Sequence, residues 1–384
     1  MPNTSDFKSI EILQGGEGYF QRLLWLIESA REVIHLQYYI LSDDPSGREI
    51  QQALLNARSR GVEVNVLLDG VGSMNLSRRF RKGLVDAGVT LRFFSPVKFS
   101  IPFRTGRRLH LKLAVFDRSF ALVGGLNIAE RYRGNAEEPP WLDFAVLIEG
   151  DICGELAELA ASLLAKRPYP KIPIKRLLGK PPLGRQKVEV RLNDVFQGRR
   201  EIRRGYNRAI SSARKSLTVV ASYFLPKRRM VKLLCKAASR GVEVRLILPG
   251  QSDVLFYGTA VKYLYPMLLK SGVRLFEYQP AVLHAKAVVA DDKWCSIGSF
   301  NLNDLSELLS IELNIEIFDE NVACAFQERL DEIMQRDCLE ARAEDYLKAS
   351  TFSRFKRKLF YLGIIQSIRL LHWFTEDNRE TPPS

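Results

Sequence analysis

The chain has 384 residues, of which 46% are hydrophobic and 26% are charged, so it can bury one or two substantial cores. Its formal net charge of +13 indicates an anionic partner, either a phospholipid surface or a nucleic acid, and the charge alone does not choose between them. The five cysteines include no CxxC pair, which argues against a disulfide framework and favours a reducing compartment.

Targeting and membrane-spanning segments are not expected. The first thirty residues contain Asp6, Glu11 and Glu17 and no basic region ahead of an apolar stretch, which argues against a signal peptide. Every run without a charged residue is well short of the roughly 20 apolar residues that a spanning helix needs. We therefore expect a protein that does not cross a bilayer.

Helical and strand patterns alternate along the first part of the chain. A helix is predicted over residues 47–60, because Gly61 stands where a glycine C-cap would end it. A buried strand follows in the segment 60–69, another begins after Gly88, and a third carries the motif described below. Strands that alternate with helices favour an α/β unit around a largely buried sheet.

The same order returns in the second part of the chain. A helix predicted over 227–240 again ends at a glycine, Gly241, and the segment 240–249 repeats the segment 60–69. We therefore predict two homologous α/β halves, each a mixed sheet flanked by helices, that pack about a pseudo-two-fold axis.

Four segments are expected along the chain. The halves are 1–165 and 188–345. The segment 166–187 carries eight Lys or Arg, five Pro and no acid, which indicates a proline-rich linker or, alternatively, a basic strap that touches lipid headgroups. The tail, 346–384, is basic and rich in aromatic residues, as in a helix that lies on a membrane surface. The alternative is that the tail packs on the core or on a second subunit.

One short pattern occurs twice. It has a histidine, a lysine two residues later, an aspartate at the end, and an asparagine seventeen residues after the histidine. The two copies are His110, Lys112, Asp117 and Asn127, and His284, Lys286, Asp291 and Asn301. Residues two apart on a strand point to the same side, so each His and Lys project together. The aspartates end the motif strands, where a turn or fold-stabilising role is expected.

Small residues precede both asparagines. The pairs are Gly124-Gly125 and Gly298-Ser299, and they allow close backbone approach before a side-chain amide that can donate hydrogen bonds. We therefore count Gly125 and Ser299 as supporting residues of the motif.

Two copies brought face to face would surround one phosphate with two imidazoles, two ammonium groups and two amides. One neutral histidine can attack phosphorus while the other, protonated, gives its proton to the leaving alcohol oxygen. The lysines and asparagines would stabilise charge on the non-bridging oxygens. No metal or other cofactor is expected, because the sequence shows no Cys, His or acid cluster with metal-ligand spacing.

The paired motif resembles the signature of the phospholipase D superfamily, over roughly residues 10–335. The segment 124–132 and the following Trp141-Leu-Asp143 are similar to the first half of bacterial cardiolipin synthases. The resemblance implies two phospholipase D-like halves with one active site at their seam, and a covalent phosphohistidine intermediate. Many cardiolipin synthases begin with transmembrane helices, which this sequence does not show.

The resemblance also implies that two acids orient the histidines. Asp143 is one. Glu316, in the stretch that begins at Leu313, is the other, with Glu312 as its competitor because the chain after Asn301 is a few residues longer than expected. Which acid serves which histidine is left open.

The function expected from the resemblance is transfer of a phosphatidyl group from a donor phospholipid to phosphatidylglycerol, with His110 as the nucleophile and His284 as the general acid. The alternatives are a phospholipase D and a nucleic-acid phosphodiesterase with the same site, or a non-catalytic anion-binding scaffold. We expect an anionic phospholipid surface as partner, no nucleic acid, and a peripheral place on the cytoplasmic side of the cell membrane. The sequence does not define an oligomeric state.

Overall fold

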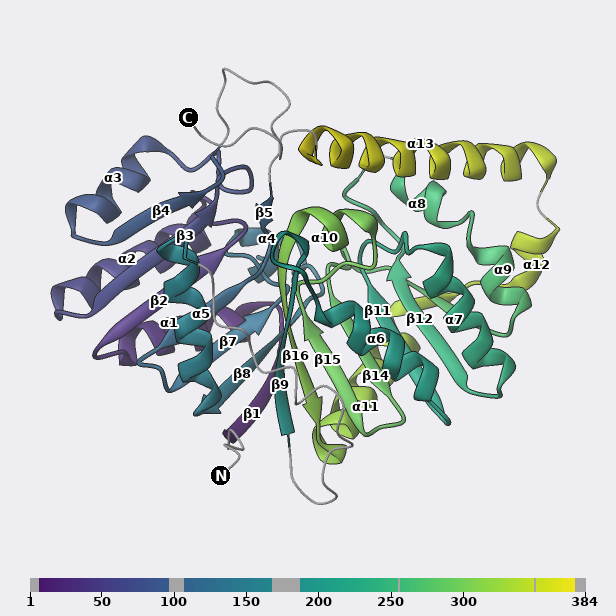
Figure 1. The fold of residues 1–384 in the computed structure, drawn as a ribbon, viewed down its shortest axis with the longest axis horizontal. Helices are drawn as coiled ribbons and strands as arrows, with labels where there is room; N and C mark the ends of the chain where they lie inside the picture. The colour runs from purple at the N-terminus through teal and green to yellow at the C-terminus, as the bar shows by residue number, and fades with distance from the viewer. Residues whose placement is uncertain (1–6, 97–106, 168–186, 255, 349, 377–384) are drawn as a thin grey trace.

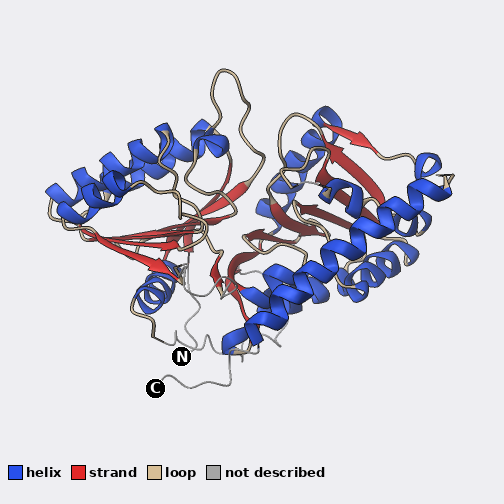
Figure 2. Cartoon of the chain, turned by 90° about the horizontal axis from the view of Figure 1, so that it is seen from above, coloured by secondary structure: helices blue, strands red, loops and turns tan. Residues whose placement is uncertain are grey.

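The computed structural model describes residues 7–96, 107–167, 187–254, 256–348 and 350–376. Its strands form two mixed sheets that lie side by side, one from each part of the chain (Figure 1). Seen from above, helices cover the outer faces of both sheets (Figure 2). The predicted fold class, two α/β units with flanking helices, is confirmed. The expected segment boundaries stay predictions, and most of the segment 166–187 lies outside the described residues.

The first sheet has seven strands in the order β1-β8-β7-β6-β2-β3-β4. Strands β2, β3 and β4 are parallel, and the remaining pairs are antiparallel. The bounds are β1 (Phe7–Gln14), β2 (Val33–Tyr38), β3 (Glu63–Asp69), β4 (Thr90–Phe94), β6 (Leu113–Phe116), β7 (Phe120–Gly124) and β8 (Phe144–Gly150).

The second sheet repeats this order as β9-β16-β15-β14-β11-β12-β13, with β10 and β17 added at its edges. The bounds are β9 (Lys187–Asp194), β10 (Arg199–Arg200), β11 (Ser216–Ala221), β12 (Glu243–Pro249), β13 (Arg274–Tyr278), β14 (Lys286–Ala290), β15 (Trp294–Gly298), β16 (Ser310–Phe318) and β17 (Cys338–Glu340). The repeat of sequence is therefore a repeat of topology.

Three apolar cores hold the layers together. One lies under α1 (Glu17–Ser29), α2 (Pro45–Ser59) and α3 (Arg78–Asp86) on the first sheet. A second lies under α6 (Glu201–Ser212), α7 (Arg228–Ser239), α8 (Tyr257–Val261) and α9 (Tyr265–Lys270) on the second sheet. The third is shared by both sheets and contains one face of α5 (Ile152–Leu164) and of α11 (Glu320–Asp337). Both halves thus bury apolar surface at their seam.

The two predicted helices are confirmed as α2 and α7. After each helix a glycine adopts a left-handed backbone, with φ of 91° at Gly61 and 88° at Gly241. This conformation costs an L-residue energy and costs glycine none, so the glycines end the helices as expected.

The motif strands begin later than the sequence suggests, because the residues before them pair across the seam. Strand β5 (Arg108–Leu109) pairs with β16 of the other half, and the backbone N–H of His110 donates to the carbonyl of Ile311 at 3.1 Å. In the same way His284 N–H donates to the carbonyl of Leu142 at 2.8 Å. Each motif histidine therefore sits on a segment that is hydrogen-bonded to the opposite half.

The two motif aspartates act on the fold, as predicted. Each has a left-handed backbone, with φ of 49° at Asp117 and 54° at Asp291. Each carboxylate accepts three successive backbone N–H groups at the start of an inner strand of its sheet, β2 or β11. The donors are Arg31, Glu32 and Val33 for Asp117, and Arg214, Lys215 and Ser216 for Asp291.

We predict that Asp117→Ala lowers the free energy of unfolding by about 2–3 kcal/mol, because three N–H donors lose a charged acceptor and alanine disfavours the left-handed backbone. Urea unfolding measures the loss. The control is Asp86→Ala on α3, which removes only an exposed ion pair with Lys82 and should cost about 0.5 kcal/mol or less. Equal losses in the two variants would contradict the structural role of Asp117.

Candidate active site

His284 is oriented by an acid from the other half of the chain. Its Nδ1 lies 2.6 Å from Asp143 Oδ2, and both side chains are buried. The Asp143 carboxylate also accepts the backbone N–H of Phe144, which fixes its direction. Because Nδ1 is engaged, the nitrogen that can meet a substrate is Nε2.

His110 is oriented in the same way, but here the histidine belongs to the first half and the acid to the second. Its Nδ1 lies 2.9 Å from Oε2 of Glu312, which belongs to β16 of the second sheet. Each half thus supplies the acid that orients the imidazole of the other half. The sequence left open which acid serves which histidine, and in the structure Asp143 pairs with His284 and Glu312 with His110.

The expectation that Glu316 orients a histidine is wrong. Its competitor Glu312 is the acid that orients His110. Glu316 stands four residues further along β16, about 13 Å away at the usual rise of a strand. Its carboxylate accepts a hydrogen bond from Arg191 Nε at 2.9 Å. The reason is the short helix α10 (Asp304–Leu309), which returns the chain to the seam sooner after Asn301 than the longer loop after Asn127 does.

Strand register shows that Asp143 and Glu312 are equivalent. Gly124 pairs with Ala145 in the first sheet, and Gly298 pairs with Asn314 in the second. Each acid therefore stands two residues before the residue that pairs with the motif glycine. The supporting residues also correspond. A β-carbon at Gly125 would collide with the Asp143 carboxylate. At the matching place Ser299 Oγ donates to Glu312 Oε2 at 2.6 Å.

Both motif lysines are buried between the histidines and the acids. Lys112 Nζ donates to the carbonyl of His110 at 2.5 Å. Lys286 Nζ lies 2.8 Å from His284 Nδ1 and 3.8 Å from Asp143 Oδ2. Burial lowers the pKa of Lys112 to about 7 and that of Lys286 to about 8, because an ammonium group loses its hydration there.

The same burial acts on the other titratable groups. It raises the pKa of Asp143 to about 7 against the opposing charge of Lys286. Burial lowers the pKa of His110, with Glu312 opposing and Lys112 and Lys286 adding to the effect. It lowers the pKa of His284 well below its usual value, and Lys286, Lys112 and His110 act in the same direction. Each motif therefore affects ionisation of the other across the seam.

The motif asparagines border the site with fixed amides. Asn127 accepts the backbone N–H of Ile40 and donates to the Tyr132 hydroxyl at 2.8 Å. That hydroxyl lies 3.4 Å from His284 Nε2. Asn301 Oδ1 accepts from Ser222 Oγ at 2.9 Å. In this arrangement Asn127 reaches His284 through a tyrosine, which the sequence did not predict.

Aromatic rings form the walls around both imidazoles. Tyr39 lies 5.0 Å from the His110 ring, and the rings of Tyr132, Trp141 and Tyr223 lie 5.3, 5.9 and 6.1 Å from that of His284. The neighbouring Tyr38 bonds Tyr19 within the core, because adjacent residues of an extended chain face opposite sides. Tyr39 directly follows the last residue of β2, and that place is the signal that could have found it.

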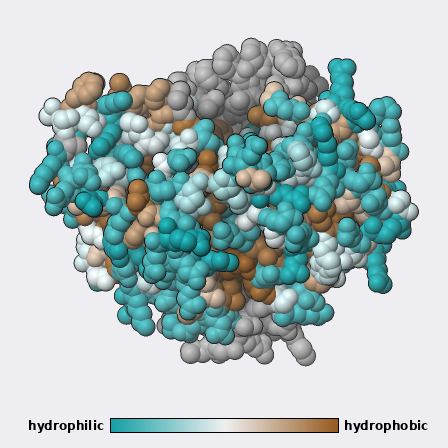
Figure 3. Space-filling view, turned by 180° about the vertical axis from the view of Figure 1, so that it is seen from behind, coloured by the Kyte–Doolittle hydropathy of each residue, from teal (hydrophilic) through white to brown (hydrophobic). Residues whose placement is uncertain are grey.

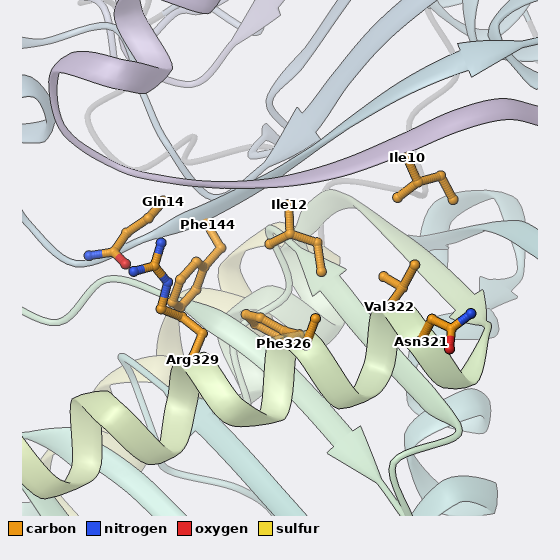
Figure 4. A pocket seen from close by; sticks show the side chains of 9 residues that line it. Ile10, Ile12, Gln14, Phe144, Asn321, Val322, Phe326 and Arg329 are labelled. Carbon is orange, nitrogen blue, oxygen red and sulfur yellow. The ribbon is translucent and has the colours of Figure 1, made fainter.

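Other features lie apart from these groups. A cavity of about 400 Å³ lies between β1 and α11 and is lined by apolar residues such as Ile12 and Phe326 and by Arg329. Figure 4 shows these side chains. Its lining includes no residue of the two motifs. Within the part of the chain that the structure describes, no group of three or more His, Cys, Asp or Glu could hold a metal ion.

The fold resembles solved structures along most of its length. It superposes on phosphatidylserine synthase from Haemophilus influenzae Rd KW20 with a TM-score of 0.70 and 18% identity, covering 94% of each chain. It also superposes on polyphosphate kinase from Porphyromonas gingivalis with a TM-score of 0.61 and 14% identity, covering 94% of this chain and 54% of that chain. At these identities the likeness concerns the fold. Together with the duplicated His-Lys half-sites, it defines the structural class, two α/β halves that each carry one His-Lys motif at their seam.

Sequence comparison narrows this class. The family model described as "Cardiolipin synthase, PLD-like domain" matches residues 23–139 and 206–335. The chain is 34% identical to cardiolipin synthase B of Escherichia coli O6:H1 (strain CFT073), over 86% of this chain and 81% of that protein. It is 32% identical to cardiolipin synthase B of Salmonella typhi, over 97% and 92% of the two chains. The chain belongs to the cardiolipin synthase family with phospholipase D-like domains.

We predict that Glu312→Gln lowers kcat by roughly 100-fold or more, because an amide cannot stabilise the charged His110 imidazole. Glu316→Gln is the matched control on the same strand and the same face. It should lower the thermal unfolding temperature by weakening the ion pair with Arg191, and leave kcat within a few-fold of the wild-type value. The reverse ranking of the two kcat values would restore Glu316 as the orienting acid.

Proposed function

We propose that this protein is a cardiolipin synthase-type phosphatidyltransferase that works through a covalent phosphohistidine. The observation that carries the proposal is the crosswise pairing of His110 with Glu312 and of His284 with Asp143, each beside a buried lysine. Membership of the cardiolipin synthase family supports phospholipids as its substrates.

The proposed reaction has two displacements at one phosphorus. In the first, Nε2 of one neutral histidine forms a bond to phosphorus while the bond to the donor's headgroup oxygen breaks. The other histidine, protonated, gives its proton to that oxygen. In the second, the histidine that served as the general acid takes the proton from a hydroxyl of phosphatidylglycerol. That oxygen attacks phosphorus, and the phosphorus–nitrogen bond breaks. Lys112 and Lys286 stabilise the non-bridging oxygens throughout.

The protonation states suit an anionic substrate. With the site empty, burial and the lysines favour neutral imidazoles. An incoming phosphate brings negative charge between the cations and thereby favours protonation of the general acid. Burial and the nearby lysines lower the pKa of both histidines, so His110, which we expected as the nucleophile, and His284 can each take that role. The adduct experiment below decides between them.

Transfer requires that a lipid hydroxyl outcompete water for the phosphohistidine. The aromatic wall of Tyr132, Trp141 and Tyr223 beside His284 supports transfer, because apolar rings leave little room for ordered water. Phosphatidic acid as the sole product, or cleavage of a nucleic acid, would instead indicate one of the two hydrolytic alternatives.

We further propose that the enzyme sits on an anionic phospholipid surface through α13 (Thr351–Glu376). One side of this helix packs on the second half, where Phe360 stacks on Phe256 at 4.6 Å and Tyr361 lies 4.8 Å from Tyr263. The other side exposes an apolar stripe with helical spacing. Its members are Phe352, Phe355, Leu359 and Leu362, which are 75%, 64%, 57% and 45% exposed.

Charge and shape around the stripe fit a membrane surface. The segment 354–374 has five basic residues and no acid. A groove of about 330 Å³ under the helix is lined by Lys262, Arg354 and Arg357 together with apolar residues. In Figure 3 apolar atoms gather at the upper left, at the end of the molecule where α13 lies. No helix in the described parts of the chain is long and apolar enough to span a bilayer.

These features support peripheral attachment, which is how amphipathic basic helices bind anionic lipids. The two expectations for the tail, packing on the core and binding a membrane, concern opposite sides of one helix. The five cysteines, none of which is in a disulfide, support a place on the cytoplasmic side.

The test of the reaction is a product analysis. Wild-type enzyme with phosphatidylglycerol vesicles, with and without phosphatidylethanolamine, should form cardiolipin, identified by mass spectrometry. His110→Ala and His284→Ala should each lower turnover at least about 1000-fold, because each removes an obligatory proton or electron-pair donor. Alkaline quenching and peptide mapping should place the phosphatidyl adduct on one of the two histidines. An adduct elsewhere, or none during rapid turnover, would contradict the covalent scheme.

The test of the membrane surface is vesicle co-sedimentation. Replacing Phe355 and Leu359 together by Glu should weaken binding to anionic vesicles roughly tenfold or more, because apolar burial is lost and negative charge is added. The matched control replaces Met74 and Val85, which are 57% and 55% exposed in the first half, by Glu. If both double variants bind as the wild type does, α13 is not the membrane contact.

A further inference from the structure

An arginine lies at the edge of the site on the His284 side. Arg131 belongs to the short helix α4 (Glu130–Arg133) and is exposed. Its guanidinium carbon lies 4.9 Å from the centre of the Trp141 ring and 5.6 Å from that of Tyr132. Both rings flank His284, so the guanidinium rests on the aromatic wall of the active site.

The position of Arg131 is fixed while its charge is uncompensated. Its carbonyl accepts the backbone N–H of Trp141 at 2.9 Å, which ties the arginine to the ring that it covers. Among the described residues, no carboxylate forms an ion pair with its guanidinium. After burial, the two lysines and His110, its charge also contributes to lowering the pKa of His284. A guanidinium held on aromatic rings and lacking a counterion is a ready binding group for a phosphate.

The distance from this cation to the reacting centre can be bounded. The Trp141 ring lies 5.9 Å from the His284 ring, and the guanidinium lies 4.9 Å beyond it at most, so Arg131 is within about 11 Å of the imidazole. The path through Tyr132, at 5.3 and 5.6 Å, gives the same limit.

The proposed acceptor has a phosphate at a matching distance. In phosphatidylglycerol the attacking hydroxyl is joined to the lipid's own phosphodiester through the glycerol. During attack six bonds then separate the two phosphorus atoms, which is roughly 7 Å when extended. The reacting phosphorus must lie about 3 Å from the histidine nitrogen. The acceptor attacks opposite the nucleophile, beside the histidine that acts as general acid and base, so its phosphate can reach Arg131 with His284 in that role, as expected from the sequence.

We propose that Arg131, held on Trp141 and Tyr132, is a subsite for the phosphodiester of the acceptor lipid. This inference rests on the proposed function and specifies how the phosphohistidine is passed to phosphatidylglycerol in preference to water. The opposite part of the wall has the wrong charge for this role, because Tyr223 donates its hydroxyl hydrogen bond to Asp253 at 2.6 Å.

The experiment is an internal competition between two acceptors. Phosphatidylglycerol vesicles are turned over in the presence of ethanol, so that one phosphatidyl-enzyme is divided between phosphatidylglycerol, ethanol and water. The ratio of cardiolipin to phosphatidylethanol reports the choice of acceptor. It does not depend on how much enzyme is folded, nor on the first displacement, which is common to both products.

Arg131→Gln should lower this ratio roughly 10- to 100-fold, because a charge-assisted contact to the anionic acceptor is lost while ethanol makes no such contact. Arg131→Lys should give an intermediate ratio. The matched control, Arg78→Gln at the exposed start of α3, should keep the wild-type ratio.

A ratio within twofold of wild type in Arg131→Gln would overturn the subsite and leave the proposed function standing. A wild-type enzyme that makes phosphatidylethanol and no cardiolipin would overturn both.

Discussion

The structure depends on hydrogen bonds that cross the seam between its two halves. The backbone of His110 is held by the strand that carries Glu312, and the backbone of His284 by the segment that carries Asp143. A single set of cross-seam contacts therefore positions both imidazoles and both acids. Neither half could make the site alone, since each would keep a buried carboxylate or lysine without its partner, at a cost of several kcal/mol.

Burial of this charge cluster has a direct consequence for catalysis. Two lysines, His284 and two acids are buried and the His110 side chain is 15% exposed, so their electrostatic interactions are stronger than at a surface. The pKa values of Lys112 and Lys286 are lowered by the same burial, which means that the empty site disfavours positive charge. We therefore expect an anionic phosphate to relieve this and to bind between the lysines. The apolar core that both sheets share provides the free energy that keeps the cluster in place.

The sequence predicted what is repeated and local. The two motifs, the helix-ending glycines at 61 and 241 and the turn aspartates follow from spacing and from residue chemistry, and they stand where they were expected. Asp143 stands where the family resemblance implied. Glu316, which the resemblance implied, was wrong and its competitor Glu312 is the orienting acid, because helix α10 sets where the chain returns to the seam and a motif resemblance does not show that. Tyr39, Tyr132 and Arg131 were missed because only tertiary packing brings them to a histidine. The segment boundaries and the role of residues 166–187 stay predictions.

The central claim is that both histidines act on one phosphorus, and a crystal structure with bound tungstate, a phosphate mimic, tests it most directly. The account predicts one anion with Nε2 of His110 and Nε2 of His284 both within hydrogen-bond distance, about 2.6–3.2 Å, and the two lysines on its remaining oxygens. Two anions at separate places, each touching one histidine, would contradict it.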